Sequence, residues 1–203
     1  MIVVIDYRAG NLYNVGLALK HLGVEHKFSS NPVEVASAEK VILPGVGSAR
    51  TAMDSLEEKG LTEAIKSLKV PFLGICLGLQ LLFESSEEED VECLGIIPGS
   101  VRRFDSRDVK VPHMGWNQVE WAREARMGMG NSLLKGIPEE GFYYFVHSYY
   151  APLSDDTTIA STEYDRTFSS AVRRGNFIGF QFHPERSGEI GLRLLDNFVH
   201  LED

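Results

Sequence analysis

The chain has 203 residues, a formal net charge of −9 at pH 7, 43% hydrophobic residues and 24% charged residues. This length suits one domain over 1–203 with its own core, and this composition is typical of globular rather than disordered proteins. The negative charge argues against a nucleic-acid surface, and no apolar run reaches the roughly 20 residues that span a membrane.

The cysteine content and the N-terminal residues bear on the cellular location. Cys76 and Cys93 are the only cysteines, too few for a disulfide framework, so we expect a reducing cytoplasm. Residues 1–6 lack the basic region that begins a signal peptide. Metal-ligating side chains form no cluster at a recognisable spacing, so neither a metal nor a cofactor is expected.

Apolar runs of strand length alternate with helical patterns over the first 85 residues. Strands are predicted at 2–5, 24–28, 40–43 and 70–75, and helices at 12–22, from Pro32, at 48–59, at 61–68 and from Leu77 to Glu84. Asn11 is expected to cap the first of these helices. The alternation indicates right-handed βαβ units and a parallel sheet that is covered by helices on both faces.

The second half of the chain has shorter predicted strands, at 100–104, 117–121, 141–146, 157–163, 170–173 and 177–182. We expect some of them to run antiparallel, which makes the sheet mixed. The acidic run at 87–90 reads as a solvated loop. Residues 123–136 read as a loop insertion, and the last helix is predicted at about 187–201.

Cys76 lies where a buried strand turns into a helix. The surrounding Gly74-Ile-Cys-Leu-Gly78 matches the G-x-nucleophile-x-G elbow, with a thiol in place of a serine. A sharp turn of this kind strains the nucleophile's backbone and leaves room only for glycine at the two flanking positions. The helix N-terminus favours a thiolate, and the Leu77 N–H is placed to donate to an oxyanion. The alternative is an inert buried cysteine.

A second candidate group follows the strand at 177–182, in His183-Pro-Glu185. Residues two apart in extended chain project to the same side, so His183 and Glu185 can both face the carboxyl edge of the sheet. A nucleophile needs a base, and the base needs an orienting group, which Cys76, His183 and Glu185 would supply in turn. A structural histidine and a solvated glutamate are the alternative.

The two motifs Gly74-Ile-Cys-Leu-Gly-Leu-Gln80 and Gly179-Phe-Gln-Phe-His-Pro-Glu185 resemble the class I glutamine amidotransferase family. Segments 5–12, 43–47, 112–117 and 143–149 are most similar to one branch, the glutaminase subunits of imidazole glycerol phosphate synthase. The resemblance runs from residue 2 to beyond 187. It implies a three-layer α/β/α, flavodoxin-like fold with a mostly parallel central sheet and added antiparallel strands.

The resemblance also implies a reaction. Cys76 would attack the side-chain amide of glutamine, and His183 would protonate the departing ammonia and then activate water. The implied oxyanion donors are Leu77 and the loop of Gly45, Val46 and Gly47. Gln80 would contact bound glutamine, and the strand end at His147, Ser148 and Tyr149 would complete the pocket. Gln80 could instead be an ordinary polar helix position.

The resemblance implies a partner as well. Ammonia would pass to a separate (β/α)8 cyclase subunit of histidine biosynthesis within a heterodimer. The implied interface residues are Asn11, Asn14, Trp116, Tyr144 and Arg186. Three alternatives stay open: a glutaminase for anthranilate or aminodeoxychorismate synthesis, a non-catalytic docking subunit, and a thiol peptidase on a related fold.

Overall fold

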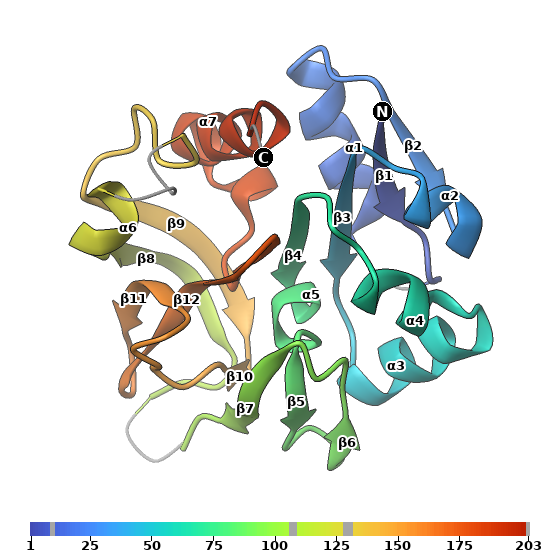
Figure 1. Ribbon diagram of the computed structural model, residues 1–203. Coiled ribbons are helices and arrows are strands. Elements are labelled where there is room, and N and C mark those ends of the chain that lie inside the picture. Colours follow the sequence, from blue (N-terminus) through green and yellow to red (C-terminus); the bar gives the residue numbers. More distant parts are fainter. Residues whose placement is uncertain (9–10, 106–108, 128–131, 202–203) are drawn as a thin grey trace.

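The computed structural model describes residues 1–8, 11–105, 109–127 and 132–201. Within these ranges the main sheet has nine strands in the order β2-β1-β3-β4-β13-β12-β11-β8-β9 (Figure 1). Its parallel half contains β2 (His26–Ser29), β1 (Ile2–Ile5), β3 (Lys40–Gly45), β4 (Phe72–Cys76) and β13 (Phe177–Phe180). The predicted parallel sheet is therefore confirmed.

The other half of the main sheet is antiparallel. It continues from β13 through β12 (Thr167–Arg174), β11 (Thr158–Glu163), β8 (His113–Trp121) and β9 (Glu140–His147). β13 is the last strand of the chain but lies between β4 and β12, so it joins the two halves. This position carries the 177–185 motif directly beside the Cys76 strand.

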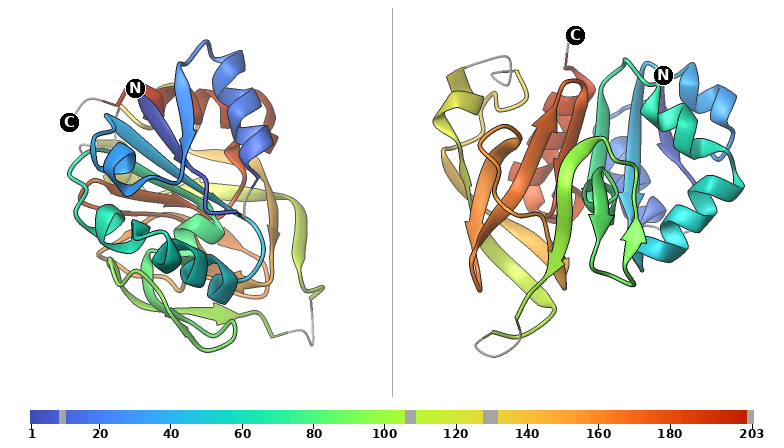
Figure 2. Two further views of the ribbon diagram at one scale, coloured as in Figure 1. Left: turned by 90° about the vertical axis from the view of Figure 1, so that its right-hand side faces the viewer. Right: turned by 60° about the horizontal axis from the view of Figure 1, so that its bottom comes forward.

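Helices cover both faces of the parallel half, which confirms the three-layer arrangement (Figures 1 and 2). Side chains alternate along a strand, so Ile2 and Val4 join one core while Val3 and Ile5 join the other. The first core is closed by α1 (Leu12–His21) and α7 (Gly188–Val199). The second is closed by α2 (Pro32–Ala36), α3 (Ala49–Glu58), α4 (Leu61–Lys66) and α5 (Leu77–Gln80).

A second, small sheet was not predicted. Its strands lie in the order β10 (Tyr149–Tyr150), β7 (Ile97–Arg103), β5 (Phe83–Ser86) and β6 (Val91–Glu92), and Figure 2 (right) brings them forward. The helix predicted from Leu77 to Glu84 ends at Gln80, so the prediction is wrong beyond that residue. The N–H groups of Leu94 and Ile97 bond the carbonyls of Leu81 and Leu82, and these carbonyls would otherwise continue the helix.

Two further predictions need correction. The stretch predicted as an irregular loop begins with a short helix, α6 (Arg123–Met127), while 128–131 lie outside the described residues. His183 to Glu185 were predicted to be extended chain, but Pro184–Arg186 form a single 3-10 turn, η1, ahead of α7. None of the helices in the described ranges combines the length and apolarity that crossing a bilayer requires.

Candidate active site

Cys76 occupies a strained turn between β4 and α5, with φ 54° and ψ −107°. A backbone of this kind costs on the order of 1–3 kcal/mol outside glycine and persists only where the surroundings enforce it. A Cβ atom on Gly78 would lie 2.0 Å from the Leu43 carbonyl oxygen, and one on Gly74 would lie 2.4 Å from the Gly78 carbonyl oxygen. The two glycines therefore permit the tight turn that the sequence predicts.

The sulfur of Cys76 is nearly enclosed, since the residue is 6% exposed. Its Sγ lies 3.8 Å from the carbonyl oxygen of Val146 and 3.8 Å from Nε2 of Gln181. Gln181 belongs to the 179–185 motif, but no role was predicted for it from the sequence. Its position two residues before His183 was the signal that could have identified it.

His183 and Glu185 form a buried pair on the neighbouring strand end. His183 Nδ1 and Glu185 Oε1 are 2.8 Å apart, and the two side chains are 2% and 0% exposed. Asn11 Nδ2 donates to the same Oε1 at 2.9 Å. Asn11 stands at the N-cap position of α1, but its side chain caps none of the helix N–H groups described, so that prediction is wrong.

The protonation of His183 is set by opposing effects. Burial lowers the pKa of His183, but the Cys76 sulfur and the Glu185 carboxylate outweigh it and raise the pKa to about 10. Its Nε2 makes no hydrogen bond to any described residue. The site therefore favours an imidazolium whose free N–H is available, and this charge stabilises negative charge on the sulfur.

A cavity of about 270 Å³ opens beside Cys76. It is lined by most of the predicted pocket residues, namely Val46, Gly47, Leu77, Gln80, His147, Ser148 and Tyr149. Gly45 instead lies behind the wall, where an added Cβ would come within 2.7 Å of the Leu77 Cβ. Glu88, Pro112 and Val146 also line the cavity, and none of the three was predicted from the sequence.

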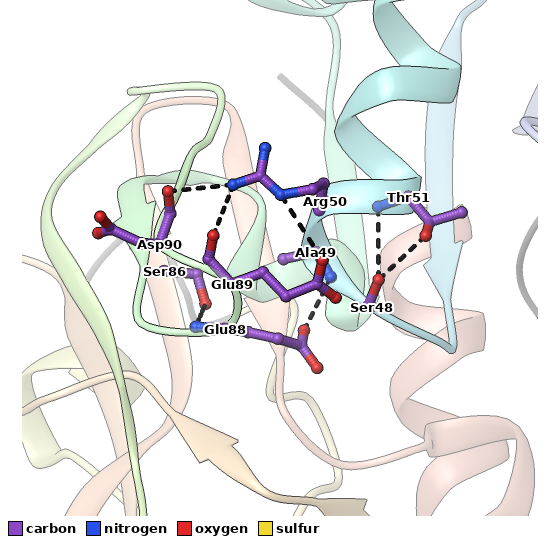
Figure 3. Close-up of polar contacts among 8 residues, drawn as sticks. All are labelled: Ser48, Ala49, Arg50, Thr51, Ser86, Glu88, Glu89 and Asp90. Atoms are coloured by element: carbon purple, nitrogen blue, oxygen red, sulfur yellow. Dashed lines mark hydrogen bonds and ion pairs between the residues drawn. The ribbon is translucent and has the colours of Figure 1, made fainter.

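The acidic run at 87–90 is an exposed turn, as predicted, except at Glu88, which is half-buried against the start of α3 (Figure 3). Glu88 Oε2 accepts from the Ala49 N–H at 2.7 Å, at the start of α3. Arg50 Nη2 donates to the carbonyl oxygens of Glu89 at 2.5 Å and Asp90 at 3.3 Å, and both of these residues have positive φ. Burial raises the pKa of Glu88 above its usual range, although the bond from Ala49 opposes this shift. Arg50 thus holds a turn that places one carboxylate in the cavity wall.

Gln80 is also built into the wall. Its Nε2 donates to the Tyr149 carbonyl oxygen at 2.8 Å and to Gln181 Oε1 at 3.1 Å. Because both amide hydrogens are used, Oε1 is the atom that Gln80 has left for a ligand. The plain alternative of a polar position on a helix surface does not fit, since the residue is 4% exposed.

The five residues predicted for the partner interface lie around η1, the turn that contains Glu185. The guanidinium of Arg186 lies 4.1 Å from the centre of the Tyr144 ring, and Trp116 meets that ring edge-on at 6.3 Å. Trp116 is 55% exposed. Asn14 lines a surface hollow that reaches Glu185, and Asn11 bonds that carboxylate directly.

Comparison with known proteins agrees with this geometry. Residues 3–201 match the family model for class-I glutamine amidotransferases. The chain is 48% identical over 202 residues to imidazole glycerol phosphate synthase subunit HisH of Bacteroides fragilis, covering 98% of this chain and 99% of that protein. It is 44% identical to subunit HisH 2 of Legionella pneumophila, covering 100% and 98% of the two chains.

Solved structures support the fold. PurLQS from Thermotoga maritima superposes with a TM-score of 0.72 at 18% identity, covering 98% of this chain and 97% of that one. The glutaminase domain of CTPS from Trypanosoma brucei superposes with a TM-score of 0.68 at 15% identity, covering 100% and 94%. The family model, the relatives and the shared architecture agree: this chain belongs to the class-I glutamine amidotransferases.

Proposed function

We propose that this chain is the glutaminase subunit of an imidazole glycerol phosphate synthase and hydrolyses L-glutamine to glutamate and ammonia. The observation that carries the proposal is the strained Cys76 turn beside the buried His183–Glu185 pair. Similarity over the whole chain to proteins named as HisH subunits supports the assignment to histidine biosynthesis.

In the first half-reaction the Cys76 sulfur attacks the side-chain amide carbon of glutamine. The carbonyl π electrons move to oxygen, which becomes an oxyanion. The proposed donors to that oxyanion are the backbone N–H of Leu77 and an N–H from the loop at 45–47. His183 then gives its Nε2 proton to the nitrogen, the C–N bond breaks, and ammonia leaves a glutamyl thioester on Cys76.

In the second half-reaction water replaces the thiol. His183, now neutral, accepts a proton from the attacking water, and the C–S bond breaks to release glutamate and restore the sulfur. Glu185 holds the imidazole by its Nδ1–H throughout, which keeps Nε2 directed at the reacting atoms. Asn11 donates to the same oxygen of this carboxylate.

The cavity wall supplies the groups that would recognise the amino-acid end of glutamine. The Glu88 carboxylate is the negative group of this wall and is suited to the α-ammonium. Gln80 Oε1 offers a second acceptor. Backbone groups of the strand end at His147, Ser148 and Tyr149 complete the pocket.

The proposal includes a partner and a compartment. Ammonia passes to a (β/α)8 cyclase subunit docked over Asn11, Asn14, Trp116, Tyr144 and Arg186, within a heterodimer. The exposed Trp116 and the Arg186–Tyr144 stack are the kinds of side chain that dominate protein interfaces. We place the complex in the cytoplasm, where a reducing medium would keep Cys76 a free thiol.

The direct test uses a glutamine-like electrophile that alkylates thiols, followed by peptide mass spectrometry. The proposal expects a single adduct on Cys76, protection by glutamine, and release of glutamate by the unlabelled protein. A lack of both labelling and turnover in the presence of the cyclase subunit would favour the docking-subunit alternative. Labelling at Cys93 instead would contradict the assignment of the nucleophile.

A further inference from the structure

Two histidines lie end to end at the cavity wall, at opposite positions on paired strands β8 and β9: His147 lines the cavity, and His113 lies behind it. His113 Nδ1 and His147 Nε2 are 3.0 Å apart, and the residues are 4% and 5% exposed. His147 Nδ1 lies 2.7 Å from the Tyr149 carbonyl oxygen. At the other end Asn117 Nδ2 lies 3.2 Å from His113 Nε2. The four groups form one continuous hydrogen-bonded chain.

The direction of this chain follows from backbone groups at its ends. Asn117 Oδ1 accepts from the Gln118 N–H at 2.8 Å, and its Nδ2 donates to the Glu163 carbonyl oxygen at 2.9 Å. The amide is thereby oriented, so its second hydrogen points to His113 Nε2, which must accept. His113 then donates from Nδ1 to His147, and His147 donates from Nδ1 to Tyr149, whose carbonyl can only accept.

The surroundings keep both rings uncharged. His113 is stacked between Tyr164 and Phe145, with ring centres 3.9 and 4.9 Å away. Burial lowers the pKa of His113 to about 4, and burial together with the charges of His113 and His183 lowers the pKa of His147 to about 3. A second proton on His147 would have to be on Nε2, where it would point at the Nδ1–H of His113. Two N–H donors would then face each other.

The chain ends at a carbonyl that is part of the cavity wall. The Tyr149 oxygen accepts from His147 on one side and from Gln80 Nε2 on the other. Its position therefore sets both the path of the strand end at 146–149 and the orientation of the Gln80 amide. Through Gln80 the same network reaches Gln181, whose Nε2 lies 3.8 Å from the Cys76 sulfur.

We propose that Asn117, His113 and His147 are positioning residues for glutamine binding: as a neutral chain of fixed direction they hold the Tyr149 carbonyl, and with it the wall and the Gln80 acceptor. This inference rests on the proposed function. The three residues act through the wall and do not touch the reacting atoms, so they set KM for glutamine more than kcat.

The test compares two replacements of His113 in the complex with the cyclase subunit. His113→Phe keeps an aromatic ring between Tyr164 and Phe145 but removes the donor. His113→Asn loses the ring but retains an N–H near the Nδ1 position. We expect KM for glutamine to rise about tenfold in His113→Phe and about threefold in His113→Asn, with kcat within about twofold of wild type. His26→Phe, a histidine remote from the cavity, is the control, with unchanged KM.

A purely structural role predicts the reverse order, with His113→Asn the worse variant, and that order would overturn the proposal. An unchanged KM in both variants would also overturn it. If His113→Phe does not fold, Asn117→Leu removes the outer donor instead, and its KM must rise in the same way.

Nitrogen-15 NMR of the histidine rings tests the chain independently of turnover. At pH 7 we expect two neutral rings protonated on Nδ1; an imidazolium or an Nε2–H tautomer at either residue would refute the inference. The NMR measurement also distinguishes a failure of the proposed function from a failure of the proposed histidine chain. A wild-type complex without glutaminase activity would reject the proposed function, while the ring tautomers would still decide whether the chain exists.

Discussion

At the scale of single residues, the strongest constraint falls on Cys76, whose positive φ places the sulfur between Val146 and Gln181 at the cavity. A cysteine that served only to fill the core would gain nothing from such a backbone. The strain is retained because Gly74 and Gly78 allow β3 and α5 to close tightly around it. This backbone supports the proposal that Cys76 is the nucleophile, with Gly74 and Gly78 permitting its turn.

Replacing Cys76 by alanine should abolish glutamine hydrolysis, because Cys76 is the one thiol among the described residues that line the cavity. The complex with the cyclase subunit should still make product from added ammonia, since that step does not need the thiol. Glutamate release and cyclase product are measured in parallel. Cys93→Ala is the matched control and should keep both activities; loss of the ammonia-dependent reaction in Cys76→Ala would contradict the division of labour.

Glu88→Gln should raise KM for glutamine by ~10- to 100-fold with little change in kcat. The reason is the loss of a charge-assisted contact to the α-ammonium, worth roughly 1.5–3 kcal/mol. Steady-state kinetics of the complex provide the measurement. The neighbouring Glu89→Gln removes an exposed carboxylate that pairs with Arg50 at 3.6 Å, and it should alter KM by less than about twofold. Equal effects of the two changes would argue against a role for Glu88 in binding.

The two buried histidines should make the fold sensitive to acid. In the unfolded chain they titrate near pH 6.5, whereas the pKa values of His113 and His147 in the fold are about 4 and about 3. As the pH falls from about 6.5 toward 4, the unfolded chain binds more protons, so the free energy of unfolding decreases. Each histidine contributes a slope of about 1.4 kcal/mol per pH unit within this window.

Urea unfolding at several pH values measures this dependence. Carboxylates titrate in the same range, so the informative quantity is the difference between wild type and His113→Phe. The variant should lose roughly one histidine's share of the slope above pH 4. Parallel curves for the two proteins would mean that His113 is not held neutral in the fold.

At the scale of elements, the strand–turn–helix of β4 and α5 depends on close backbone contacts rather than on helix length. α5 has a single turn, so its dipole is small compared with that of a long helix. The contacts of Gly78 with the end of β3 set the geometry instead, because any side chain there would overlap the Leu43 carbonyl.

Gly78→Ala should therefore disrupt the site and destabilise the protein by several kcal/mol, at the upper end of the range for single substitutions. Gly95→Ala makes a useful comparison. Gly95 has a positive φ of +66°, whereas Gly78 does not, and a Cβ added to Gly95 would meet no atom within 4 Å. The cost of Gly95→Ala should therefore stay near 1 kcal/mol, with activity retained. Thermal melts and glutaminase assays of both variants provide the test; similar losses in the two variants would contradict the claim that overlap with the Leu43 carbonyl sets the geometry of the elbow.

The sequence predicted the parallel half well because its signals are local. Buried strands such as Ile2–Ile5 and helices such as α3, with Ser48 capping the Thr51 N–H, are specified by neighbouring residues. The small sheet was missed because its strands form by pairing between distant segments. For example, the Ile97 N–H bonds the Leu82 carbonyl, which would otherwise be bonded within a further helical turn after Gln80. Such long-range strand pairing produces no periodic pattern of apolar residues in the local sequence.

The same distinction applies to the site. The sequence alone predicted three site residues because they lie in short motifs: Cys76, His183 and Glu185. Glu88 lies in an acidic run that is typical of a solvent-facing loop, and its place in the cavity wall depends on distant contacts: the Ala49 N–H bonds its carboxylate, and Arg50 bonds Glu89 and Asp90. The His113–His147 pairing joins residues on two strands, and spacing along the chain gave no sign of it.

At the scale of the whole molecule, β13 connects two functions. Its carboxyl end carries His183 to Cys76, and the following turn carries Arg186 to the cluster with Tyr144 and Trp116. Glu185 lies between them and is bonded by Asn11 of α1. A partner that docks on this cluster would press on the elements that hold the His183–Glu185 pair, which gives a physical route from docking to catalysis.

The loop at 45–47 is the other place where a partner can act. Val46 is 41% exposed and Gly47 has φ +101°, so the peptide that should offer the oxyanion donor is lightly constrained. We therefore expect the isolated chain to hydrolyse glutamine slowly and the docked chain to do so quickly.

The most direct measurement is glutamate release from glutamine, first by this chain alone and then with a purified histidine-pathway cyclase subunit plus its nucleotide ligand. We expect slow release by the chain alone and a large increase only with that partner. Rapid release by the chain alone, or stimulation only by a chorismate-pathway partner, would contradict the assignment to imidazole glycerol phosphate synthase.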